Sequence, residues 1–204
     1  MKVLFAHGFE GTPDGGKPTY MREELGWDVV APVMSDHGWN IEQQTSVLLE
    51  LIDAEEFDLV AGSSMGGLAA ANASQQRPSA KFGLLLIAPA FGLEEMWNDR
   101  LSSNEMNHWE ACNAYQYRGF ELEMILGWDF METAKQMSWP KLNHSTAILH
   151  GTQDDVVPIE YSRIIAEREA NVIAMMELDD GHRMQQSKTH FAQAAELCLN
   201  SQTR

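Results

Sequence analysis

The sequence places a serine between two glycines, in the order Gly62, Ser64 and Gly66, directly after a short apolar run at residues 57–61. A strand, such a turn and then a helix hold the serine in a strained conformation, with its hydroxyl clear of the backbone. The glycines leave room where a side chain would collide with the neighbouring strand and helix. Free N–H groups at the start of a helix also favour developing negative charge. The motif therefore predicts that Ser64 is a nucleophile.

A serine hydroxyl becomes an effective nucleophile only when a base removes its proton, and histidine is the usual base. The chain has 7 histidines. The strongest candidate is His182, because it follows a glycine after the last apolar run, in a loop that could fold back toward Ser64. We expect His7 and His150, which open loops at strand ends, to brace those loops.

A histidine base needs a carboxylate that fixes its tautomer and stabilises its charged form. Asp154 and Asp155 both lie in the loop after the fifth apolar run. One of them would be this acid and the other a turn or helix-capping residue, and their spacing alone does not choose between them. Asp179 and Asp180 are close to His182 in the sequence, where side chains rarely face each other well. We therefore expect these two carboxylates to be solvated.

Acyl transfer also needs hydrogen-bond donors for the oxyanion, usually two backbone N–H groups. The first candidate is the N–H of Met65, directly after the serine. The second is the N–H of Phe9, in the glycine-rich loop at residues 7–16, and Glu10 beside it is an alternative. The identity of the side chain matters little for this role.

Apolar runs alternate with helical segments along most of the chain, which predicts an α/β fold with a doubly wound parallel sheet. Near-continuous apolar runs are typical of strands buried on both faces. We expect about six strands, at residues 2–6, 27–31, 58–61, 82–88, 146–149 and 172–178. We expect helices on both faces of the sheet, at residues 17–26, 41–54, after the Ser64 turn to about 76, 159–170 and 187–200. The loops that carry the candidate residues would all open on one edge of this sheet.

The length and charge limit the possible partners. The 204 residues most simply form one domain. The net charge of −16 argues against nucleic acid and anionic membrane surfaces, and it disfavours polyanionic substrates such as coenzyme A thioesters. The 2 cysteines have no metal-ligand spacing. No stretch is long enough to span a bilayer, and the first apolar run is too short for a signal peptide, so we expect a cytoplasmic protein.

Four segments together resemble the α/β-hydrolase superfamily, in particular its small bacterial esterase-like members. They are His7-Gly8-Phe9, residues 62–67, residues 150–158 and Asp180-Gly181-His182, and the resemblance spans nearly the whole chain. The family's pattern His-Gly-x-x-Asp-x-x-Val-Pro matches Asp154, so the resemblance selects Asp154 over Asp155. It also implies that Ser64 is the nucleophile and His182 the base.

The resemblance implies a sheet with the spatial order 2-1-3-4-5-6, because the antiparallel pair that opens the full family sheet is missing here. It also implies a serine hydrolase that cleaves carboxylic esters of small or medium acyl groups through an acyl-enzyme, without a metal or organic cofactor. A thioesterase would use the same residues. A reading of another class is a binding module with an idle site, but the complete set of Ser64, Asp154 and His182 speaks against it.

The alternation of strands and helices breaks down at residues 91–140, where this family often carries a cap over its site. This region holds four of the 6 tryptophans and shows no clear strand, so we expect two or three short helices. One interpretation is that Trp97, Trp109 and Trp128 line an acyl or aromatic pocket. The other is that they pack a small helical insertion onto the sheet, and the two interpretations are compatible.

Overall fold

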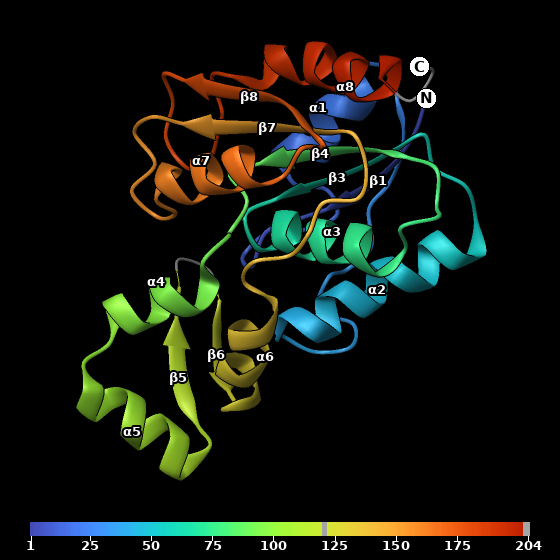
Figure 1. The fold of residues 1–204 in the computed structure, drawn as a ribbon. Helices are drawn as coiled ribbons and strands as arrows, with labels where there is room; N and C mark the ends of the chain where they lie inside the picture. Colours follow the sequence, from blue (N-terminus) through green and yellow to red (C-terminus); the bar gives the residue numbers. More distant parts are fainter. Residues whose placement is uncertain (120–121, 202–204) are drawn as a thin grey trace.

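The protein is described by a computed structural model that covers residues 1–119 and 122–201. Its main sheet has six strands in the order β2-β1-β3-β4-β7-β8, and all neighbouring strands are parallel (Figure 1). These strands are β1 (Lys2–Ala6), β2 (Asp28–Val30), β3 (Leu59–Ser63), β4 (Gly83–Ile87), β7 (Thr146–Gly151) and β8 (Val172–Leu178). Numbered along the chain without β5 and β6, which lie outside this sheet, the order is 2-1-3-4-5-6, so the predicted topology is confirmed.

Helices cover both faces of the sheet, as Figure 1 shows. One face carries α1 (Gly16–Glu23) and α8 (Phe191–Asn200), and the other carries α2 (Ile41–Ala54), α3 (Met65–Gln76) and α7 (Ile159–Arg168). Along β1, Val3 and Phe5 belong to one core, whereas Leu4 and Ala6 belong to the other. The strand is therefore apolar throughout because both of its faces are buried. None of the described helices combines the length and the apolar character that a membrane-spanning helix needs.

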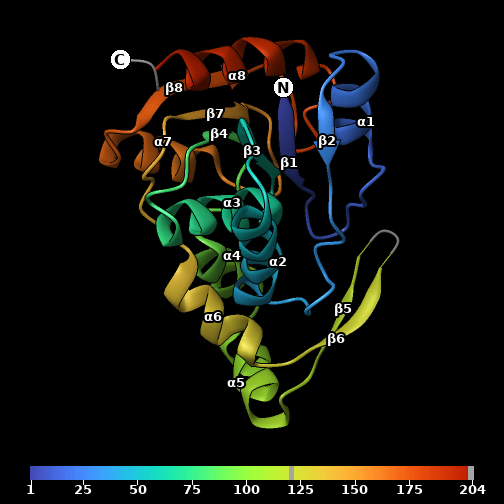
Figure 2. The ribbon, with the colours of Figure 1, turned by 90° about the vertical axis from the view of Figure 1, so that its right-hand side faces the viewer.

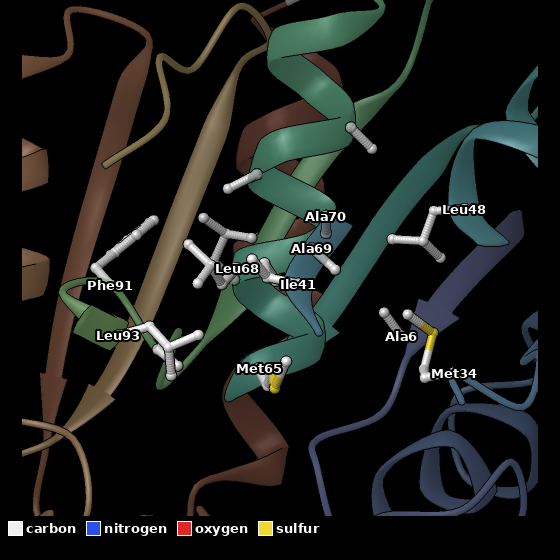
Figure 3. Packing of buried hydrophobic residues seen from close by; sticks show 14 of the residues in the cluster. Ala6, Met34, Ile41, Leu48, Met65, Leu68, Ala69, Ala70, Phe91 and Leu93 are labelled. Atoms are coloured by element: carbon white, nitrogen blue, oxygen red, sulfur yellow. The ribbon is translucent and has the colours of Figure 1, made fainter. Parts of the chain in front are cut away.

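The helix that follows the serine turn lies at the centre of the larger core. Figure 3 shows Leu68, Ala69 and Ala70 of α3 next to Ile41 of α2. All four side chains are fully buried. Because α3 packs on the sheet with one side and on α2 with another, it consists mainly of small residues. The backbone of this helix is consequently fixed close to the strands, which also fixes the turn before it.

The chain leaves the main sheet between β4 and β7. The elements formed there are α4 (Leu93–Arg100), α5 (Ser103–Cys112), β5 (Tyr115–Arg118), β6 (Glu123–Leu126) and α6 (Asp129–Met137), which together we call the insertion. Figures 1 and 2 show the insertion on the side of the molecule away from both chain termini. The predicted cap at residues 91–140 includes residues 120–121, and the predicted domain also includes residues 202–204. These five residues lie outside the described part of the chain.

The prediction that residues 91–140 contain no strand was wrong, because β5 and β6 form an antiparallel pair with Tyr115 opposite Leu126 and Tyr117 opposite Met124. In β5 the tyrosines are half-buried, whereas Gln116 between them is exposed. This alternation is the pattern of a strand with one buried face, but a run of four residues is too short to stand out in the sequence.

Replacement of Leu68 by alanine tests the dependence of the fold on α3. The side chain of Leu68 is fully buried, so the variant leaves a cavity and should lower the free energy of unfolding by about 2–5 kcal/mol. Leu197→Ala on α8 is the matched control, because its side chain is 38% exposed and should cost much less. Urea denaturation measures both, and similar losses would contradict the central position of α3.

Candidate active site

Ser64 occupies the turn between β3 and α3 and has φ 56° and ψ −124°. A residue with a side chain rarely adopts this conformation, because of steric strain. Backbone hydrogen bonds hold it on both sides: the N–H of Ser64 donates to the carbonyl of Ile87 at 3.0 Å, and its carbonyl accepts from the N–H of Ala90 at 3.0 Å. The surrounding backbone therefore imposes the strained geometry that the Gly-x-Ser-x-Gly motif predicts.

The glycines around Ser64 are required by close backbone contacts. A Cβ atom at Gly62 would collide with the carbonyl oxygen of Gly66, and one at Gly66 would collide with the carbonyl oxygens of Ala6 and His7. The strand before the serine, the helix after it and the end of β1 thus approach more closely than any side chain allows. This contact brings the loop after β1 next to the serine.

The structure brings Ser64, His182 and Asp154 into one hydrogen-bonded chain. The Nε2 atom of His182 lies 3.0 Å from the Oγ of Ser64, and its Nδ1 lies 2.8 Å from the Oδ2 of Asp154. These residues come from the loops after β3, β7 and β8, which all open on the carboxyl edge of the sheet. An N–H at Nδ1 that donates to the carboxylate leaves Nε2 as the acceptor for the serine hydroxyl. A histidine held in this way can remove a proton from a serine.

Asp154 is fixed and kept ionised by donors from three directions. Its Oδ1 accepts the N–H groups of Val156 at 2.9 Å and Val157 at 2.8 Å, while Oδ2 lies 3.1 Å from Nε2 of His150 and also accepts from His182. Burial alone opposes ionisation, but the hydrogen bonds from His150 and His182 outweigh it and hold the pKa of Asp154 well below its usual range. The side chain of Asp155 is exposed and lies at the rim of the site.

The two histidines that were expected to brace loops do so. His7 accepts the N–H of Met34 at Nε2, at 3.2 Å, and its Nδ1 lies 2.8 Å from the carbonyl of Gly8. His150 is fully buried, and its Nδ1 lies 2.7 Å from the hydroxyl of Ser162. The contact of His150 with Asp154 is a role that sequence reasoning missed.

The expectation that Asp180 is solvated was wrong, because its side chain is buried. Its Oδ1 accepts the N–H of Gly181 at 2.8 Å, and its Oδ2 accepts those of Gln186 at 2.8 Å and Ser187 at 2.9 Å. Backbone donors inside a loop need acceptors, and a short carboxylate followed by glycine supplies them. Asp180 thus shapes the loop that carries His182.

A cavity of about 580 Å³ lies beside Ser64. Phe9 and Met65, the two residues whose N–H groups were singled out as oxyanion donors, line it together with the serine. Most of its other walls are apolar or aromatic, among them Leu93, Met96, Trp97, Tyr117, Phe130 and Val157. The cavity therefore offers an apolar group a place directly next to the serine hydroxyl.

Of the three tryptophans expected to line a pocket, only Trp97 lies on the wall of this cavity. Trp109 is 1% exposed, and its Nε1 donates to the carbonyl of Leu126 at 2.9 Å. Its ring packs against Trp97 at 5.4 Å and Trp128 at 5.5 Å. Neither Trp109 nor the half-buried Trp128 lines this cavity, so for these two residues the structure favours the interpretation that they pack the insertion.

Tyr117 of β5 connects the insertion to the loop after β1, and sequence reasoning missed it because it lies in the unrecognised hairpin. Its hydroxyl donates to Oε1 of Glu10 at 2.7 Å, and its ring packs edge-on against Phe9 at 5.1 Å. Burial and the neighbouring carboxylate of Glu10 raise the pKa of Tyr117 to about 12. Trp39 and Phe130 also pack edge-on against the ring of Phe9.

The described residues contain no group of three or more histidine, cysteine or acidic side chains that could hold a metal ion.

A model of the uncharacterised protein family UPF0227 matches residues 2–198. The chain belongs to this family. No curated protein matches the sequence.

Several solved structures are similar to the chain over nearly its whole length. Est1E from Butyrivibrio proteoclasticus with ferulic acid bound has a TM-score of 0.76 and 18% identity, over 100% of this chain and 90% of that chain. Alpha/beta hydrolase domain-containing protein 10 from mouse has a TM-score of 0.72 and 19% identity, over 99% and 88%. The monoacylglycerol lipase from Paleococcus ferrophilus has a TM-score of 0.70 and 19% identity, over 97% and 93%. The α/β-hydrolase fold that the sequence resemblance implied is confirmed.

The low pKa of Asp154 predicts a specific loss of stability in acid. The carboxylate has a lower pKa in the folded than in the unfolded chain, so it stabilises the fold above the unfolded pKa of about 4, and this contribution falls as the pH drops toward the folded pKa. Between pH 4 and 2, Asp154→Asn should reduce the slope of unfolding free energy against pH by up to about 1.4 kcal/mol per unit. Urea denaturation across this pH range measures the slope for wild type and for Asp154→Asn. Equal slopes would contradict a lowered pKa of Asp154 in the folded protein.

Proposed function

We propose that this protein is a serine hydrolase that cleaves carboxylic esters of small or medium acyl groups. The observation that carries the proposal is the hydrogen-bonded chain from Ser64 through His182 to Asp154, with distances of 3.0 and 2.8 Å. It lies next to a largely apolar cavity, where an acyl group would fit. The similar folds of Est1E, which has ferulic acid bound, and of a monoacylglycerol lipase add support at the level of the reaction class.

In the proposed acylation step, the Oγ of Ser64 attacks the ester carbonyl carbon while Nε2 of His182 takes the hydroxyl proton. The carbonyl oxygen becomes an oxyanion, which accepts hydrogen bonds from the N–H groups of Phe9 and Met65. When the carbon–oxygen bond to the alcohol breaks, Nε2 gives the proton to the departing oxygen. The products of this step are the free alcohol and an acyl group on Ser64.

In the proposed deacylation step, His182 removes a proton from a water molecule that attacks the acyl carbonyl. Collapse of the second oxyanion returns the proton to Ser64 and releases the carboxylic acid. The ionised Asp154 stabilises the charged imidazole in both steps and keeps its Nδ1–H oriented. His150 and the backbone donors of Asp154 support the reaction by holding that carboxylate in place.

A thioester would react by the same steps, and it is the second candidate substrate. The net charge of −16 disfavours polyanionic coenzyme A carriers. The reading of another class, a binding module with an idle site, predicts a serine that does not react with an electrophile. Reaction of Ser64 with a fluorophosphonate therefore separates the enzyme from the binding module.

Wild-type protein should form a single adduct with a fluorophosphonate probe, seen by intact mass, because His182 activates Ser64. Ser64→Ala and His182→Ala should form none, and Ser64→Ala should lower ester turnover by roughly 10^4-fold or more. Ser63→Ala, at the adjacent buried serine, is the matched control and should still be labelled. A folded wild type without an adduct, or a Ser64→Ala variant with wild-type turnover, would refute the proposed nucleophile.

Replacement of Asp154 and replacement of its neighbour Asp155 should have sharply different effects on the rate of ester hydrolysis. Asp154→Asn removes the partner that orients and stabilises His182, so kcat should fall by about 10^3–10^4-fold. Asp155→Asn changes an exposed side chain outside the hydrogen-bonded chain of Ser64, His182 and Asp154, and it should cost far less. Ester hydrolysis by both variants, with circular dichroism to check the fold, makes the comparison. A larger loss in Asp155→Asn would assign the acid to that residue instead.

A further inference from the structure

A second cavity, of about 340 Å³, adjoins the one beside Ser64. Asp155 and Val156 line both cavities, so the loop after β7 forms their shared boundary. The remaining walls come from the loop after β8 and include His182, Arg183, Gln185 and Gln186. The mechanism proposed above uses the larger cavity for the acyl group and leaves this second space without a role.

The position of His182 indicates which part of an ester would occupy this second cavity. Its Nε2 lies 3.0 Å from the Oγ of Ser64, and the residue also lines the second cavity. In the proposed reaction, Nε2 protonates the departing oxygen, so the leaving alcohol must lie against His182. The N–H groups of Met65 and Phe9 would bind the carbonyl oxygen, and the apolar cavity that these two residues line with Ser64 would take the acyl group. The second cavity is therefore on the leaving-group side.

The walls of the two cavities differ in chemistry. The side-chain amides of Gln185 and Gln186 can both donate and accept hydrogen bonds, whereas the guanidinium of Arg183 donates and the carboxylate of Asp155 accepts. An anionic leaving group would face Asp155, a cationic one would face Arg183, and an apolar one would remove water from all four side chains. A hydroxyl group both donates and accepts, so a neutral group with several hydroxyls satisfies this wall best.

The polar wall is anchored to the rest of the site. The buried carboxylate of Asp180 accepts the N–H groups of Gly181, Gln186 and Ser187 at 2.8–2.9 Å, which defines the path of the loop after β8. The carbonyl of Asp180 also accepts the N–H of Gln153 at 3.0 Å, which ties this loop to the one that carries Asp154. The backbone that carries Gln185 and Gln186 therefore has a defined position relative to His182.

We propose that the cavity beside His182 is a leaving-group subsite for an alcohol that carries further hydroxyl groups. The substrate would then be the ester of an apolar acyl group with a polyol such as glycerol or a sugar. This inference rests on the ester hydrolysis proposed above and adds the class of the leaving group to it.

The test compares kcat/KM for 1-hexanoylglycerol and propyl hexanoate, which share the acyl group and a three-carbon alcohol but differ by two hydroxyls. Wild type should favour the glycerol ester by about tenfold or more, because each added hydrogen bond contributes a few-fold. The double variant Gln185→Leu/Gln186→Leu keeps side chains of similar size without hydrogen-bonding groups, and it should bring the ratio toward one. Gln76→Leu, at the exposed end of α3, is the matched control and should keep the wild-type ratio.

The outcomes separate this inference from the proposed function. If wild type hydrolyses both esters with a ratio near one, or if the preference survives in the double variant, the subsite is wrong while the hydrolase proposal stands. Faster turnover of 1-hexanoylglycerol 3-phosphate than of 1-hexanoylglycerol would assign the cavity to an anionic alcohol and also overturn the inference. If the folded wild type hydrolyses none of these esters and is not labelled by the fluorophosphonate, both proposals fall together.

Discussion

The candidate site depends on one buried negative charge, the carboxylate of Asp154. A buried charge is costly unless hydrogen bonds replace its lost hydration. Its partners come from the end of β7, from its own loop and from the loop after β8, namely His150, Val156, Val157 and His182. Adjacent positions of β7 and β8 in the parallel sheet make this arrangement possible, because both strands deliver their loops to the same edge.

Backbone constraint explains why much of the site could be predicted from the sequence. The turn at Ser64 admits only glycine at Gly62 and Gly66, because side chains there would collide with carbonyl groups, and such steric needs leave a clear local motif. The parallel sheet could also be predicted from the sequence, since strands buried on both faces must be apolar along their whole length. Two of the groups that hold Asp154, the N–H groups of Val156 and Val157, are close to it in the sequence, whereas His182 reaches it from the loop after β8.

The insertion could not be predicted as well, because tertiary contacts determine which side of each element is covered. Trp97 and Trp109 lie in the same tryptophan-rich segment, and the sequence does not distinguish them. In the structure Trp97 lines the cavity, whereas Trp109 is buried inside the insertion. The hairpin of β5 and β6 is stabilised by packing of Tyr115 and Tyr117, which local propensity does not reveal in four residues. Asp180 was misjudged for a related reason, since its partners lie up to seven residues later in the chain.

The packing of Phe9 has a consequence for how this family can diversify. The ring of Phe9 is held by Tyr117 and Phe130 of the insertion, while its backbone belongs to the loop beside Ser64. Remodelling of the insertion toward a new acyl group would therefore also move a proposed oxyanion donor. Family members whose selectivity changes through the insertion should also carry compensating substitutions in the loop after β1. Substitutions in the insertion and in this loop should therefore be correlated within the family.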